Sequence, residues 1–223
     1  MKRRHVAACT GVLVVLAASA WAQAPAAPSP WAQSADGRWR ARGDGEQLVI
    51  DDLREGLHAR TLPVRALDGR GRGGVAEVHA VAARRSFVVV FESLDELWEV
   101  SIDPAAEPIY DGLVHDYKMG EGIARPGFLN PRRTRLDAPL RGLRFDRSGG
   151  FVIGRAPDRE SQGRPAAVLQ VWQLDIRRRI GERVVRGDPD LAAARLIEVD
   201  GRDMLWIPDR AGGAPLRIDW RQP

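Results

Sequence analysis

The residues best suited to chemistry in this chain lie in the segment YDGLVHDYK, residues 110–118. Its histidine, His115, follows an apolar pair and precedes Asp116 and Tyr117. A neutral imidazole can bind a metal or act as a general base, and a neighbouring polar group can fix which ring nitrogen carries the proton. The pattern therefore fits three roles for His115: a ligand to a metal or tetrapyrrole, a general base, or a structural histidine.

The remaining histidines and a run of arginines are weaker candidates. His79 lies in VAEVHAVA, where alternation assigns it to one face of a strand and favours a structural role, and His58 lies in a turn. Arg132 and Arg133 could receive the carboxylates of a ligand as bidentate partners. Because 34 residues of the chain are lysine or arginine, a solvated charged face is the commoner explanation for such a run.

Motifs of the common enzyme classes are absent from the sequence. It contains no Gly-x-Ser-x-Gly, no phosphate loop, no Gly-x-Gly-x-x-Gly that opens a helix and no His-Glu-x-x-His. The glycine-rich run at residues 69–74 lies between strand-like segments, so we expect a flexible connection there rather than a phosphate site. The sequence names no reaction, and this favours a protein that is not an enzyme.

The first 22 residues predict export. Lys2, Arg3 and Arg4 precede an apolar stretch at residues 6–20, and a small-x-small site ends at Ala22, which is typical of a secretory signal peptide. The apolar stretch is shorter than the roughly 20 residues of a membrane-spanning helix. We therefore expect a periplasmic protein without a membrane anchor, in which an Ala- and Pro-rich linker at residues 23–33 precedes one domain at residues 34–223.

Removal of this segment changes what the composition allows. Cys9 is the only cysteine, so the mature chain is expected to have no disulfide, no thiolate ligand and no covalently attached c-type haem. Without Lys2, Arg3 and Arg4 the basic residues almost equal the 30 acidic residues in number. A nearly neutral chain has no general electrostatic attraction to nucleic acid.

Four segments of the chain share one plan, in which a turn and an apolar strand are followed by a loop and a second, alternating strand. They occupy residues 36–53, 84–103, 148–176 and 200–220. In LWEVSI (97–102) and VWQLDI (171–176) the apolar residues alternate with polar ones, which predicts one buried and one wet face. Repeats of this kind predict an all-β protein of four propeller-like blades, and a β-sandwich or barrel is the alternative.

The alternation also predicts the core. The expected buried residues are Phe87, Val89, Trp98, Val100, Phe151, Ile153, Trp172, Leu174, Leu205 and Ile218. Helical periodicity is weak throughout, and the best candidate for a helix is a short segment at residues 188–195 that has Pro189 in its first turn.

Residues 96–155 resemble a known family. The phrases LWEV, YDGLVHDY and RRTRLDAPL are similar to the propeller that carries haem d1 in cytochrome cd1 nitrite reductases and, more closely, to periplasmic haem d1 biogenesis proteins. Those relatives have eight blades and about twice this length, so the resemblance implies that this chain supplies about half of such a ring. Because the chain has no Cys-x-x-Cys-His, it cannot be a complete nitrite reductase.

Two functions follow from the resemblance and from the short chain. The first is a non-catalytic interaction or accessory module of the cytochrome d1 type in the periplasm. The alternative is a protein that binds haem d1 or another tetrapyrrole in haem d1 biogenesis or denitrification, with His115 as the metal ligand and with Asp116, Tyr117, Arg132 and Arg133 around the cofactor. In either case we expect the open half-ring to pair with a second copy or with a periplasmic partner.

Overall fold

The computed structural model describes residues 30–110, 124–161 and 163–220. Fifteen strands form four antiparallel sheets in this part of the chain, and the only helical element there is the 3-10 turn η1 (Ala82–Arg84). The first sheet contains β1 (Trp31–Gln33), β2 (Trp39–Asp44), β3 (Gln47–Asp52) and β4 (Leu57–Pro63). The second contains β5 (Val75–Val81), β6 (Ser86–Phe91), β7 (Glu96–Ser101) and β8 (Pro131–Arg135). The third contains β9 (Arg141–Phe145), β10 (Phe151–Ser161), β11 (Arg164–Gln173) and β12 (Arg178–Val185), and the fourth contains β13 (Arg195–Val199), β14 (Arg202–Ile207) and β15 (Leu216–Asp219).

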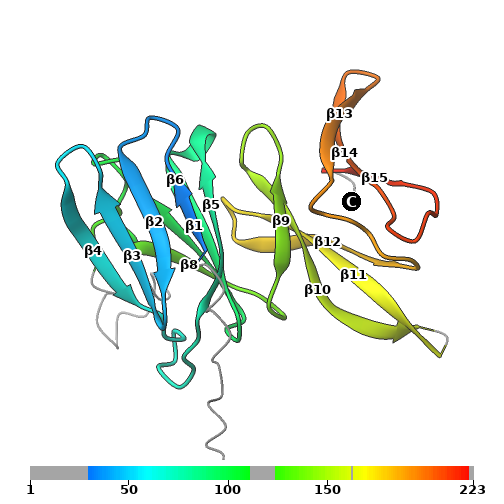
Figure 1. The fold of residues 1–223 in the computed structure, drawn as a ribbon, viewed down its shortest axis with the longest axis horizontal. Coiled ribbons are helices and arrows are strands. Elements are labelled where there is room, and N and C mark those ends of the chain that lie inside the picture. Colours follow the sequence, from blue (N-terminus) through cyan, green and yellow to red (C-terminus); the bar gives the residue numbers. More distant parts are fainter. Residues whose placement is uncertain (1–29, 111–123, 162, 221–223) are drawn as a thin grey trace, which may run out of the picture.

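Within each sheet every strand pairs with its neighbour along the chain. Tight turns make this possible. Asp200 and Gly201 connect β13 to β14, and both have a positive φ, 52° and 73°, as a two-residue type I′ turn requires. The prediction of four propeller-like β units is confirmed, and Figure 1 shows them following one another along the molecule in sequence order.

The sheets stack face to face through three apolar cores. The first core lies between the first and second sheets, the second between the second and third, and the third between the third and fourth. Successive side chains of β6 point to opposite faces of the sheet, so Phe87 and Val89 pack in the first core and Val88 and Val90 pack in the second. Strands in the middle of the stack are therefore buried on both faces.

Nine of the ten predicted core residues are buried, and Phe151 is only partly buried at the margin of the third core. The prediction of a wet face was wrong for the second sheet. Leu97 packs in the second core, and Glu99 pairs with Arg84 at 2.6 Å, because the third sheet covers this face. In the third sheet, Ile176 was expected beside Trp172 but is exposed in the turn after β11.

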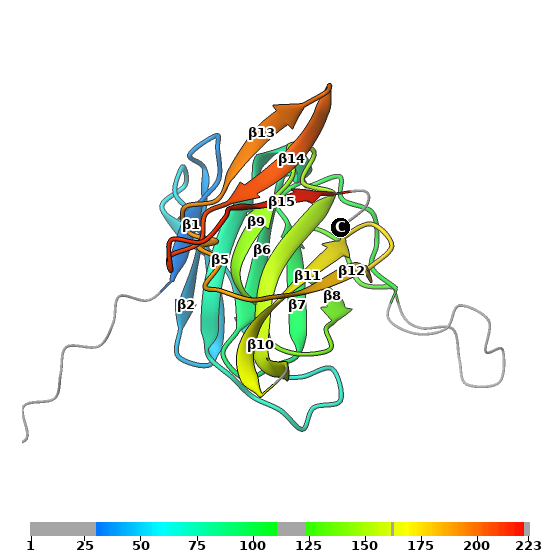
Figure 2. The same ribbon diagram turned by 90° about the vertical axis from the view of Figure 1, so that its right-hand side faces the viewer.

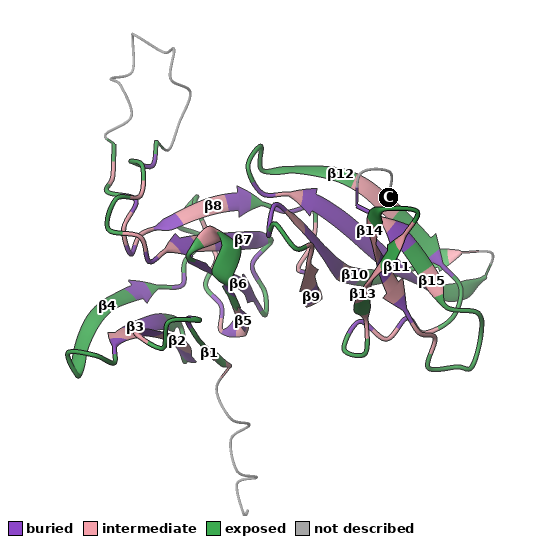
Figure 3. Ribbon diagram, turned by 90° about the horizontal axis from the view of Figure 1, so that it is seen from above, coloured by how far each residue is buried: buried purple, intermediate pink, exposed green. Residues whose placement is uncertain are grey.

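Seen from above, the four sheets form an open fan (Figure 3). The first strands of the sheets lie toward one side, where β1 and β2 contact β5 and β5 contacts β9. The fourth strands β4 and β12 lie at the outer side and are largely exposed. The first and fourth sheets are at opposite ends of the fan, and Figure 2 views the molecule from the end that the fourth sheet forms.

This arrangement excludes two alternatives for the described residues. None of the sheets there closes into a barrel, and four stacked sheets are not a two-layer sandwich. Residues 188–194 form an irregular turn and not a helix, and Arg195 begins β13. Nor does any described helix have the length and hydropathy needed to cross a membrane.

Candidate functional site

Three of the predicted site residues, His115, Asp116 and Tyr117, lie in residues 111–123, outside the described part of the chain. The described ends of that segment are held together. Ile109 and Arg125 exchange two backbone hydrogen bonds of 2.8 and 2.9 Å. The segment therefore leaves and rejoins the fold at one point of the connection between β7 and β8, and the predicted role of His115 stays a prediction.

The structure places Arg132 and Arg133 on opposite faces of β8. Arg132 donates to the Asp175 carbonyl oxygen at 2.5 Å, toward the third sheet. Arg133 donates to the Arg65 carbonyl oxygen at 2.9 Å, toward the first sheet, and its guanidinium lies 4.4 Å from the Trp98 ring centroid. Neighbouring residues of a strand point to opposite faces, so these two side chains link sheets and do not converge on one ligand.

A different pair, Glu77 and His79, occupies the first strand of the second sheet. Both side chains point toward the third sheet, and His79 Nε2 lies 2.8 Å from Glu77 Oε2. Glu77 in turn accepts hydrogen bonds from the backbone N–H groups of Gly142 (2.5 Å) and Leu143 (3.1 Å) at the start of β9. The carboxylate is thus fixed by the neighbouring sheet, and it fixes the imidazole.

The electrostatics of Glu77 favour its charged form. Burial alone would raise the pKa of this carboxyl, but the hydrogen bonds from His79, Gly142 and Leu143 outweigh burial and hold the pKa below its ordinary value of 4.5. An ionised Glu77 accepts a proton-bearing Nε2, which leaves the lone pair of His79 on Nδ1.

The surroundings of His79 leave that nitrogen available. The imidazole packs against Phe145 of β9, with ring centroids 5.6 Å apart, and its side chain is 26% exposed. Nδ1 makes no hydrogen bond to any described residue. A carboxylate that orients one ring nitrogen while the other stays open is the arrangement of metal-binding histidines.

The other described histidine, His58, has a different environment. It lies on the outer strand β4 and is 54% exposed. Its Nε2 is 2.8 Å from Thr61 Oγ1 and its Nδ1 is 3.5 Å from Asp51 Oδ1. Because both of its ring nitrogens face polar partners, His58 is the weaker ligand candidate.

Elsewhere in the described residues, a cavity of about 270 Å³ lies between the first and second sheets. It is lined by arginines, including Arg38 and Arg54, over an apolar floor that includes Trp39 and Ile102, and none of its lining residues is a histidine. The described part of the chain also contains no group of three or more His, Cys, Asp or Glu side chains that could hold a metal ion. The described residues therefore form no metal site made of protein ligands alone. The iron of a tetrapyrrole, in contrast, needs only one histidine from the protein.

The sequence alone did not single out Glu77 and favoured a structural role for His79, which stays a prediction. A signal was present, because the spacing Glu-x-His on a strand puts the carboxylate and the imidazole on the same face. What the sequence could not show was the position of β5 at the first edge of its sheet, next to β9.

The network makes one prediction about acid stability. A carboxyl whose pKa is lowered by folding stabilises the folded state above its unfolded pKa, and that contribution is lost as the pH falls through the folded pKa. We therefore expect the difference in melting temperature between the wild type and Glu77→Gln to be largest near neutral pH and to shrink below about pH 4.5. Thermal melts followed by circular dichroism from pH 7 to pH 3 measure it, and a difference that stays constant across that range would contradict an ionised, hydrogen-bonded Glu77.

Comparison with known proteins gives one informative relative. No family model matches the chain. Dihydro-heme d1 dehydrogenase of Pseudomonas aeruginosa is 26% identical over 191 residues, which cover 84% of this chain and 33% of the relative. The solved structure of dihydro-heme d1 dehydrogenase in complex with DHE matches with a TM-score of 0.60 at 23% identity, over 85% of this chain and 37% of that chain. Hydrazine synthase of Kuenenia stuttgartiensis matches with a TM-score of only 0.30, at 11% identity.

The structural match shows that the described sheets have the arrangement of part of that relative. The chain spans about one third of the relative's length, less than the half that the sequence suggested. The predicted resemblance to the haem d1-type propeller proteins is confirmed, because this chain is similar in sequence and in fold to part of dihydro-heme d1 dehydrogenase.

Proposed function

We propose that this chain binds a tetrapyrrole of the haem d1 type and acts in haem d1 biogenesis or denitrification. The observation that carries the proposal is the similarity to dihydro-heme d1 dehydrogenase, which extends over 84% of the chain. The structure supports it with an oriented imidazole on the inner side of the fan, where the first strands of neighbouring sheets come together. These findings favour tetrapyrrole binding over a non-catalytic interaction or accessory module.

The residues present fit such a group. His79 would hold the iron through Nδ1, and Glu77 would orient the imidazole by accepting a hydrogen bond from its Nε2–H. A bound tetrapyrrole would supply an iron centre for ligand binding or electron exchange. His115 is a second candidate ligand, from the segment outside the described residues.

An accessory role without a reaction remains the second candidate function. It is favoured by the roles of Arg132 and Arg133, which link neighbouring sheets and do not converge on one ligand. Such a protein would carry or present a tetrapyrrole, or bind a partner, without converting it. Both candidates place the chain in the periplasm, on the basis of its first 22 residues.

Absorption spectroscopy tests the proposal. Purified mature protein titrated with hemin, as an available iron tetrapyrrole, should show a saturable shift of the Soret band, and protein isolated from a denitrifying culture should be coloured. A colourless isolate whose titration follows that of free hemin would favour the accessory role without a cofactor.

Processing is predicted separately. We expect export with cleavage after Ala22, because charged, apolar and small residues follow one another in the order of a signal peptide. Intact-mass spectrometry of the exported protein should give the mass of residues 23–223. A mass that retains residues 1–22, or one that includes a lipid on Cys9, would contradict this expectation.

A further inference from the structure

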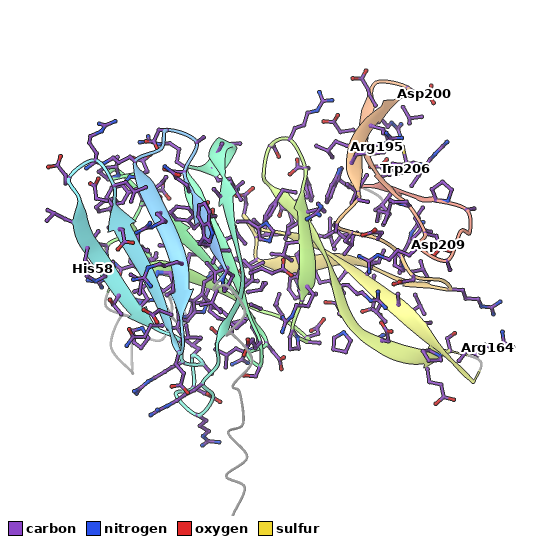
Figure 4. The ribbon with its side chains drawn as sticks, in the orientation of Figure 1. His58, Arg164, Arg195, Asp200, Trp206 and Asp209 are labelled. Atoms are coloured by element: carbon purple, nitrogen blue, oxygen red, sulfur yellow. The ribbon has the colours of Figure 1, made fainter. Side chains whose placement is uncertain are left out.

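The two end sheets of the fan each have one face that no other sheet covers. The second and third sheets pack through an apolar core on both faces, whereas the first sheet packs only through the first core and the fourth only through the third. Figure 4 shows His58 on the first sheet at one end of the molecule, and Arg195 and Trp206 on the fourth sheet at the other. The same chain therefore presents two uncovered sheet faces in the described residues.

The uncovered face of the fourth sheet combines apolar residues with arginines. Trp206 lies between Arg195 and Arg217 across the three strands, and Met204 lies between Ile197 and Asp219 in the next row. These side chains point away from the third core, because their neighbours Leu205 and Ile218 point into it. The Arg195 guanidinium lies 4.5 Å from the Trp206 ring centroid, so the aromatic side chain is partly covered by a cation and not by another sheet.

The uncovered face of the first sheet is mixed in charge and has an exposed aromatic ring. Trp31 is 61% exposed and lies in one row with Arg42, Val49 and Thr61. Another row contains Arg40 and Asp51, whose side chains are 2.9 Å apart. With Asp44 in the third row, this face has as many aspartates as arginines.

We propose that the fourth sheet of one chain packs on the first sheet of a second copy, and that a two-fold axis repeats the contact. This pairing continues the stacking that already joins each sheet to the next within the chain. The two-fold axis makes the same contact twice, so the fourth sheet of each copy covers the first sheet of the other. Both free faces of each copy are then covered in one closed dimer.

Charge decides between this pairing and contact between like faces. The uncovered face of the fourth sheet has three arginines, Arg195, Arg202 and Arg217, and one aspartate, Asp219, which lies 3.7 Å from Arg202. Two such faces in contact would both be positively charged, which is unfavourable.

On the first sheet, Asp44 and Asp51 are paired with Arg42 and Arg40 of the same face, so this face has no net charge and does not repel the arginines of the fourth sheet. The same face offers Trp31 to the apolar rows. In the closed dimer, the first strands of the sheets of both copies surround one common centre. The contact itself does not depend on a bound tetrapyrrole.

Sedimentation velocity on mature protein free of tetrapyrrole tests the dimer. We expect the wild type to be dimeric, and we expect Trp206→Glu and Trp31→Glu each to weaken dimerisation by about tenfold or more, since aromatic residues dominate interface energies. Val184→Glu is the matched control. Val184 is 48% exposed on β12 of the third sheet, away from both faces, and its replacement should leave the dimer intact. A wild-type monomer at high concentration, or a series of larger oligomers, would overturn the closed dimer.

Cross-linking identifies which faces meet, even if a tryptophan variant folds poorly. The mature chain is expected to lack cysteine, so Thr61→Cys marks the first sheet and Val199→Cys marks the fourth. A short bis-maleimide should join the two variants when they are mixed and should join neither variant to itself. Cross-linking of Val199→Cys to itself would overturn the pairing of unlike faces, and this result is independent of whether the protein binds a tetrapyrrole.

Discussion

Replacement of His79 by alanine should abolish the saturable Soret shift on titration with hemin while the protein keeps its fold. His79 is the described histidine with an open ring nitrogen, and its side chain fills no core, so its removal costs the iron ligand and little packing. Loss of the residue that would hold the iron should weaken binding by at least about 10–100-fold, because loss of a residue that only orients a metal ligand already costs that much. Absorption titrations of wild type and variant at equal concentration measure the effect, and circular dichroism verifies the fold.

Two further variants make this test specific. His58→Ala removes an exposed histidine whose ring nitrogens both have polar partners, so its titration should match that of the wild type. Glu77→Gln keeps His79 but removes the charge that orients it, and it should weaken binding less than His79→Ala does. If His79→Ala binds as the wild type does and His115→Ala does not, His115 is the ligand and Glu77 with His79 is a structural pair.

The sequence was sufficient to predict the fold because its determinants are local. An alternating strand followed by a tight turn, such as Asp200 and Gly201, specifies a hairpin, and four such units predict four sheets. Aromatic and branched residues in those strands, such as Trp98 and Val89, identified the cores. Burial on both faces was not predictable from alternation, because Glu99 resembles a solvent-facing residue until Arg84 and the third sheet are placed against it.

The candidate site was less predictable because it depends on contacts between sheets. Adjacent arginines on β8 suggested one anion site. The side chains of Arg132 and Arg133 instead donate hydrogen bonds to backbone carbonyl oxygens on opposite sides of the sheet. The pair that the structure assembles needs Gly142 and Leu143, which are more than 60 residues away from Glu77 in the sequence. Only the packing of β5 beside β9 brings these groups together, so a single strand shows the residue types but not their partners.

Replacement of Trp98 by alanine should strongly destabilise the fold. Trp98 is fully buried in the first core, where its ring lies 4.7 Å from that of Phe91 and under the guanidinium of Arg133. Its Nε1–H donates to Glu96 Oε2 at 2.7 Å, and Glu96 is itself buried. The substitution creates a cavity and removes a hydrogen bond from a buried carboxylate, so we expect a loss of about 3–5 kcal/mol in the free energy of unfolding, enough to unfold a marginal domain.

Urea denaturation followed by circular dichroism measures this loss, and two matched variants divide it into its causes. Trp98→Phe keeps an aromatic ring but has no N–H, so it should cost about 1–3 kcal/mol by leaving an oxygen of Glu96 without its donor. Val184→Ala alters a side chain that is 48% exposed on β12, away from both uncovered end faces, and it should change stability by no more than about 0.5 kcal/mol. If Trp98→Ala and Val184→Ala unfold at the same urea concentration, the first core does not hold the first and second sheets together as its packing indicates.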